Sequence, residues 1–144
     1  MADLGERFSG ALHNSSRAWR QALDRRLKHL GVSQASWMTI AAVAKAGTPP
    51  SQSELADRLG VEGATMVAMV DRLVKAGFVV REPSRTDRRI KRVALTKAGT
   101  ELYGKLLTEA AAFRKELLAQ VDQKKLLVAT ELLEALQGVL DTPP

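Results

Sequence analysis

Basic side chains are concentrated in one short segment of the chain, residues 81–97. The segment holds seven lysine and arginine residues and two acidic residues, a local net charge of +5 in a chain whose total is +6. Clustered guanidinium and ammonium groups bind phosphates, because neutralising a nucleic acid backbone releases its condensed counterions. The segment therefore indicates a polyanionic partner, with nucleic acid as the leading candidate.

An acidic residue inside this basic run indicates how the run is organised. Asp87 should weaken binding to phosphates unless it orients an arginine through a charge-assisted hydrogen bond. We therefore expect Asp87 to hold a guanidinium group in place. Its candidate partners are Arg72, Arg85 and Arg89.

The residues around the basic run predict the elements that position it. Apolar residues at 78–80 and at 93 and 95 predict two short strands, with the basic run at their turn. Upstream, the sequence 51–54 has the spacing of a capping box and opens a short helix that ends at Gly60. After a tight turn, a second helix ends at Gly77. Two such helices form a helix-turn-helix, and a hairpin directly after them makes it winged.

The rest of the chain is predicted to be helical. Apolar residues recur at helical spacing over 8–30, 34–45 and from 96 to the end. The terminal helices present more apolar surface than one copy could bury, which favours a homodimer. The expected fold class is mainly α (α+β): a winged helix-turn-helix DNA-binding domain with a two-stranded β wing at 33–96, and a helical dimerisation region built from 1–32 and 97–144.

The second helix of the helix-turn-helix is expected to enter the major groove of double-stranded DNA. Its apolar periodicity is interpreted as an inward face of Val67, Val70, Leu73 and Val74. The opposite face then carries Thr65, Ala68, Met69 and Arg72. This face has few groups that could form bidentate hydrogen bonds with bases, so DNA shape should supply much of the specificity.

Several classes of function are not predicted. The chain has no cysteine, and His13 and His29 lack ligating neighbours at metal spacing, so no metal or cofactor is expected. It shows no arrangement of nucleophile and base and no phosphate-binding glycine loop, so an enzyme is not expected. No run approaches about 18 apolar residues, so we expect a cytoplasmic protein, associated with the nucleoid of a bacterium, with no membrane partner. The alternative function is a winged protein-interaction module that docks an acidic protein and is not retained on duplex DNA.

Two segments resemble the MarR family of bacterial transcriptional regulators. Residues 84–99 resemble its wing signature, D-x-R followed by a basic strand and L-T-x-x-G, and residues 70–79 resemble the end of its recognition helix. The resemblance implies a homodimer on a pseudo-palindromic promoter site, with Arg89 in a minor groove and Asp87 as its buttress. The full set of expected DNA contacts is Ser51, Thr65, Ala68, Met69, Arg72, Arg85, Asp87, Arg88, Arg89 and Lys91.

The resemblance also implies a response to a small molecule. Arg17 and Trp37 match an arginine and a tryptophan that line the ligand pocket in the salicylate-responsive, SlyA-like branch, and Met66 is a further candidate lining residue. We therefore expect a repressor that a salicylate-like aromatic carboxylate releases from DNA. Ala41 and Ala68 replace a pocket histidine and a recognition-helix arginine of relatives. The absence of thiols excludes the cysteine-based peroxide sensors of the family.

Overall fold

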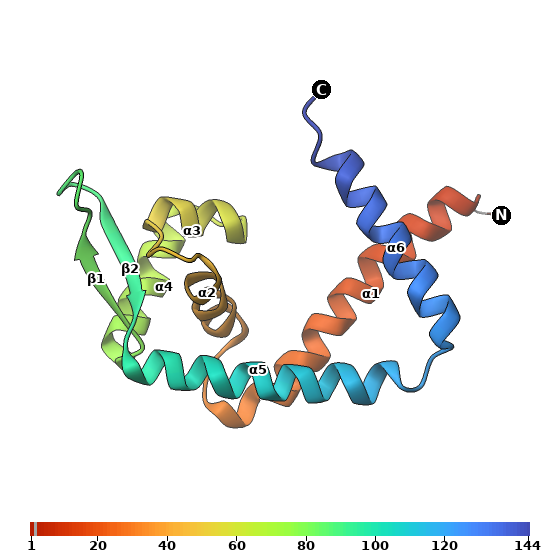
Figure 1. Cartoon of the computed structure of the whole chain (residues 1–144), viewed down its shortest axis with the longest axis horizontal. Coiled ribbons are helices and arrows are strands. Elements are labelled where there is room, and N and C mark those ends of the chain that lie inside the picture. The colour runs from red at the N-terminus through yellow and green to blue at the C-terminus, as the bar shows by residue number, and fades with distance from the viewer. Residues whose placement is uncertain (2) are drawn as a thin grey trace. The chain divides into compact units, whose positions relative to one another are not determined.

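The computed structural model describes residue 1 and residues 3–144, and its elements follow the order that the sequence predicts (Figure 1). The chain forms two compact units, residues 1–109 and 110–144. The helices Gln52–Leu59 and Gly63–Ala76 and the two-stranded sheet of the winged helix-turn-helix all lie within the first unit. Because the described chain is mainly helical with one two-stranded sheet, the predicted fold class is confirmed. No described helix is both long and apolar enough to cross a membrane. The elements are α1 (Leu4–Leu27), η1 (Lys28–Leu30), α2 (Gln34–Lys45), α3 (Gln52–Leu59), α4 (Gly63–Ala76), β1 (Val79–Pro83), β2 (Lys91–Leu95), α5 (Lys97–Leu118) and α6 (Gln123–Leu140).

Side-chain caps fix the starts of the helices in the winged domain. The Ser33 hydroxyl accepts a hydrogen bond from the Ser36 backbone N–H at the start of α2, and the Ser51 hydroxyl accepts one from Glu54 at the start of α3. Gly60 ends α3 with φ 65°, a left-handed conformation that glycine adopts without a steric penalty. The predicted span of α2 and the predicted cap of α3 are confirmed.

The core of the first unit joins the helices to both wing strands. β1 contributes Val79 and β2 contributes Val93, and both side chains are fully buried against the helices. The hairpin is therefore packed onto the helix-turn-helix at its base, while its turn extends beyond the helices (Figure 1). The core cluster comprises Leu27, Ile40, Val43, Leu55, Ala56, Met66, Met69, Val70, Leu73, Val79, Val93, Leu102 and Leu106.

The predicted inward face of α4 is wrong at two of its four positions. Met69 is 5% exposed and packs in the core, whereas Val67 and Val74 are 39% and 38% exposed. The buried residues are Met66, Met69, Val70 and Leu73. They have i, i+3, i+4, i+7 spacing and share Val70 and Leu73 with the predicted inward set, while Met66 and Met69 are buried in place of Val67 and Val74. Long, flexible methionine side chains fill the space toward α2, where the Ser36 hydroxyl lies 3.6 Å from the Met69 sulfur.

The L-T-x-x-G motif forms the junction between α4, the wing and α5. The Thr96 hydroxyl donates to the Gly77 carbonyl at 2.6 Å and accepts from the Gly99 N–H at 3.0 Å. The Thr96 backbone N–H donates to the Phe78 carbonyl at 3.0 Å. A Cβ atom at Gly99 would lie 2.0 Å from that same Phe78 oxygen, so the junction closes only around a glycine.

Candidate nucleic-acid interface

The wing is a regular antiparallel hairpin with an ordered tip. β1 and β2 pair from Val79 with Leu95 to Pro83 with Lys91. Beyond this ladder, the Ser84 N–H donates to the Ile90 carbonyl at 2.9 Å, and the Ile90 N–H donates to the Asp87 carbonyl at 3.0 Å. These bonds fold the tip back on itself, so its basic side chains are carried by a defined backbone.

Asp87 holds Arg89 by three hydrogen bonds. The Arg89 Nε and NH2 groups donate to the two carboxylate oxygens at 3.1 and 3.0 Å, and the Arg89 backbone N–H donates at 3.0 Å. The side-chain bond, followed by the backbone bond, lowers the pKa of Asp87, and Asp87 raises the pKa of Arg89. The prediction that Asp87 orients an arginine is confirmed, and the partner is Arg89. Its side chain remains 90% exposed, so the guanidinium is oriented yet available to a partner.

Two other arginines of the basic run are attached to the helices. Arg81 donates to Gln52 Oε1 at 2.7 Å and to the Val67 carbonyl at 3.2 Å, and it forms an ion pair with Asp71 at 2.6 Å. Because these partners lie on α3 and α4, Arg81 joins the middle of β1 to both helices of the helix-turn-helix. Strand alternation could have revealed this role, since residue 81 shares a face with the buried Val79.

Arg92 makes the corresponding connection from β2. Its NH1 group lies 3.1 Å from Glu54 Oε1 and 3.3 Å from the Pro49 carbonyl oxygen. The Glu54 carboxylate of the predicted capping box is therefore engaged by the wing. The charges of Arg81 and Arg92 are compensated by acids, so the positive charge of the basic run that is available to a polyanion is smaller than the sequence count suggests.

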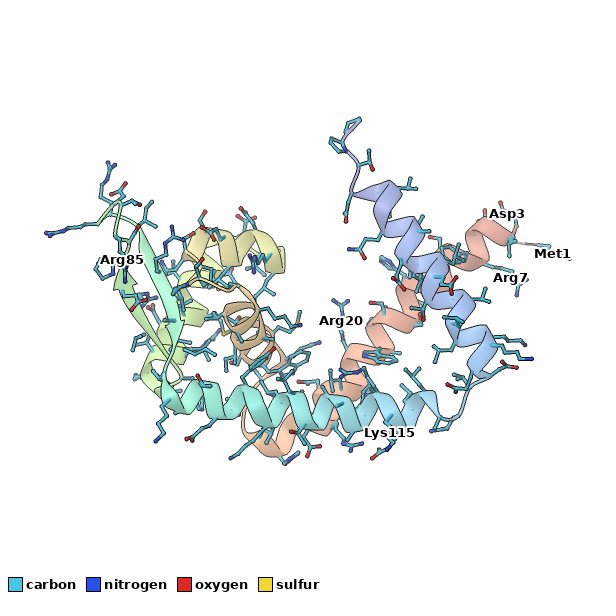
Figure 2. All side chains as sticks on the ribbon, in the orientation of Figure 1. Met1, Asp3, Arg7, Arg20, Arg85 and Lys115 are labelled. Atoms are coloured by element: carbon cyan, nitrogen blue, oxygen red, sulfur yellow. The ribbon has the colours of Figure 1, made fainter. Side chains whose placement is uncertain are left out.

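The remaining predicted DNA contacts divide by exposure. Ser51 is 8% exposed and caps α3, and Met69 is 5% exposed and packs in the core, so neither has an exposed side chain. Arg85 lies on the wing (Figure 2). It helps to line a hollow of about 630 Å³ between the hairpin and residues 48–49. The predicted contacts with exposed side chains on α4 and the wing are Thr65, Ala68, Arg72, Arg85, Arg88, Arg89 and Lys91.

The structure does not bring the three predicted ligand contacts together within one chain. Arg17 lines a hollow of about 340 Å³ on α1, together with His13 and Arg20. Met66 is buried and lines a separate apolar cavity of about 130 Å³ between α2, the α3–α4 turn and α4. Trp37 lines neither of these two cavities, and its Nε1 donates to Asp24 at 3.2 Å.

Comparisons with known proteins agree with this architecture. A model of the MarR family matches residues 30–90. A solved structure of the transcriptional regulator PA3341 is 36% identical over 93% of this chain and 98% of that chain, with a TM-score of 0.81. A mutant of MarR from E. coli is 22% identical (95% and 98% covered, TM-score 0.82), and CouR from Rhodococcus jostii RHA1 is 20% identical (100% and 99% covered, TM-score 0.81). The chain belongs to the MarR family of transcriptional regulators.

Proposed function

We propose that the chain is a homodimeric transcriptional repressor that binds a pseudo-palindromic site in duplex DNA. The winged domain, 33–96, would contact DNA, and 1–32 with 97–144 would form the dimerisation region. One observation carries the proposal: Arg89 is oriented by Asp87 at the tip of a hairpin that Arg81 and Arg92 attach to the helix-turn-helix. A minor groove concentrates negative potential and attracts an inserted arginine, while the adjacent helix occupies the major groove.

The other exposed basic residues of the wing support contact with the DNA backbone. Arg85, Arg88 and Lys91 are exposed. Because contacts with phosphates carry no sequence information, these side chains would hold the protein in register on the duplex without specifying bases. Affinity should fall steeply as salt concentration rises, since each phosphate contact releases counterions.

Uncovered apolar side chains at both ends of the chain support the dimer. On α1, Leu4, Phe8 and Leu12 are exposed. No described residue of α6 is buried, although the helix is rich in leucine and valine. Several large apolar residues exposed along one helix indicate an interface, and a second copy of the chain would cover them symmetrically. The exposed large apolar residues of α6 are Leu127, Val128, Leu132, Leu133, Val139 and Leu140.

Charges on one face of α6 should disrupt this dimer. Val128 and Leu132 are 67% and 54% exposed and share a helical face. We expect the double variant Val128→Glu, Leu132→Glu to raise the dimer dissociation constant by at least about 100-fold, because each subunit would bury unpaired carboxylates. Sedimentation equilibrium measures the change. The variant Thr130→Glu, Gln137→Glu places the same charges about 180° around the helix and should stay dimeric. Equal dissociation of both variants would contradict a specific interface on the first face.

We further propose that a small aromatic carboxylate releases the repressor from DNA. The hollow on α1 supports this, since it combines the guanidinium groups of Arg17 and Arg20 with the apolar Leu12 side chain. Guanidinium groups bind carboxylates, often in a bidentate manner. CouR, which shares the fold, was solved bound to p-coumaroyl-CoA. Release requires that the ligand bind one dimer geometry more tightly than the other.

Selection of bound duplexes from a random library, with and without salicylate, tests the proposal. We expect enrichment of a palindrome whose half-sites lie about one helical turn apart, with less DNA recovered when salicylate is present. Placing the selected site over a promoter should lower transcription from it. Failure to retain duplex DNA at low salt, combined with a stoichiometric protein complex in a pull-down, would instead support the protein-interaction function.

A further inference from the structure

Three exposed residues on the N-terminal half of α4 are apolar: Ala64, Val67 and Ala68. They share a face that continues to Asp71, at the spacing i, i+3, i+4, i+7, and the exposed Thr65 lies beside them. Val67 has the largest side chain of the three and is 39% exposed. Ala64, Val67 and Ala68 offer no side-chain hydrogen bond to a base, so these three side chains can recognise only apolar features of a groove.

Asp71 would repel DNA if its charge were uncompensated. Its carboxylate lies 2.6 Å from the Arg81 guanidinium, which removes most of that repulsion. The same guanidinium donates to the Val67 carbonyl at 3.2 Å. Val67 lies on one turn of α4, and Arg81 ties that turn to the middle of β1. Because β1 leads into the wing tip, the Val67 side chain and the Arg89 guanidinium are held in a defined register along any bound duplex.

We propose that Val67, with Ala68 beside it, recognises thymine through its 5-methyl group in the major groove. The inference rests on the proposed DNA binding and names the base that this site recognises. Among the four bases, only thymine presents a methyl group on its major-groove edge. Cytosine at the same position would place its amino donor against the valine methyl groups, where it would find no acceptor. The selected half-sites should therefore carry thymine opposite this turn.

Replacing thymine by deoxyuridine removes the methyl group and keeps the hydrogen-bonding edges. In the selected duplex, we expect one or two uracil positions in each half-site to weaken wild-type binding about four-fold per methyl group. Val67→Ala should be insensitive to uracil at one of these positions. Val74→Ala is the matched control, because Val74 is 38% exposed on the same helix but lies two turns closer to its C-terminus. It should retain the wild-type response. Fluorescence anisotropy measures the affinity of the wild type and both variants for the thymine and the uracil duplexes.

Two results would overturn the inference while leaving the proposed function intact: wild-type affinity unchanged by uracil at every position, or Val67→Ala as sensitive to uracil as the wild type. In both cases the protein would still bind the selected duplex. A protein that binds no duplex would overturn both the inference and the proposed function. Circular dichroism on each variant checks folding, which should be preserved because Val67 and Val74 are exposed.

Discussion

Arg89→Ala is expected to reduce the affinity of the dimer for its selected site by about 1–3 kcal/mol for each of its two wings. The reason lies in the geometry of the tip. Asp87 holds the guanidinium through both carboxylate oxygens, so little conformational freedom is lost when the side chain enters a groove. The preference for A·T pairs flanking the half-sites should relax at the same time, because a narrow A·T minor groove is what attracts the arginine.

Binding isotherms at several salt concentrations distinguish this role from a general loss of charge. Arg7→Ala removes one positive charge from α1 and should change affinity little, even at low salt. Asp87→Ala should also weaken binding, because it leaves Arg89 unoriented while making the wing more positive. If Arg89→Ala and Arg7→Ala had the same effect at every salt concentration, the wing would contribute only charge, and the groove assignment would be wrong.

The second large effect concerns stability. Gly99→Ala is expected to lower the free energy of unfolding by about 3 kcal/mol or more. The added Cβ would lie 2.0 Å from the Phe78 carbonyl oxygen and 3.0 Å from its carbon. Those atoms belong to the backbone that joins α4 to β1, so relieving the clash requires moving the wing or α5. The Thr96 hydrogen bonds would be strained in the same movement.

Gly104→Ala on the same helix provides the control. Apart from the adjoining residues of its own helix, no atom lies within 4 Å of a Cβ at Gly104, so the substitution gains only the helix propensity of alanine. It should raise stability by about 0.5–1 kcal/mol. Urea denaturation of the two variants should therefore shift the midpoint in opposite directions. A Gly99→Ala midpoint at or above the wild-type value would show that the junction can relax.

Features that depend on neighbouring residues in the chain could be predicted from the sequence. The cap at Ser51 and the stop at Gly60 are set by short-range hydrogen bonds and backbone angles, and both are where the pattern placed them. The Asp87–Arg89 pair spans two residues, so an acid within a basic turn was enough to indicate it. The residue pattern alone left Arg72, Arg85 and Arg89 open as partners of Asp87; the family resemblance implied Arg89, and the structure confirms it.

Features that depend on packing between distant segments could not be predicted. The apolar residues of α4 fit two stripes equally well, and contact with α2 decided that Met69 is buried and Val67 exposed. The same limit applies to the ion pair between Arg92 and Glu54, 38 residues apart. Counting charges along the chain treated Arg92 as available to DNA, whereas folding brings it to an acid. The same limit applies to the proposed ligand contacts, which lie far apart in the sequence. The structure places Arg17 and Met66 in different cavities.

The contact between β2 and the residues before α3 also protects the hairpin from aggregation. A two-stranded sheet has two open edges, and open edges are templates for pairing with other chains. Along β2, the Val93 N–H is already bonded to the Pro50 carbonyl at 2.8 Å, and Ser51 forms a bridge with Arg92. Along β1, Arg81 and Glu82 carry charges and Pro83 has no N–H to donate. Both edges of the hairpin therefore disfavour strand-to-strand pairing with another copy.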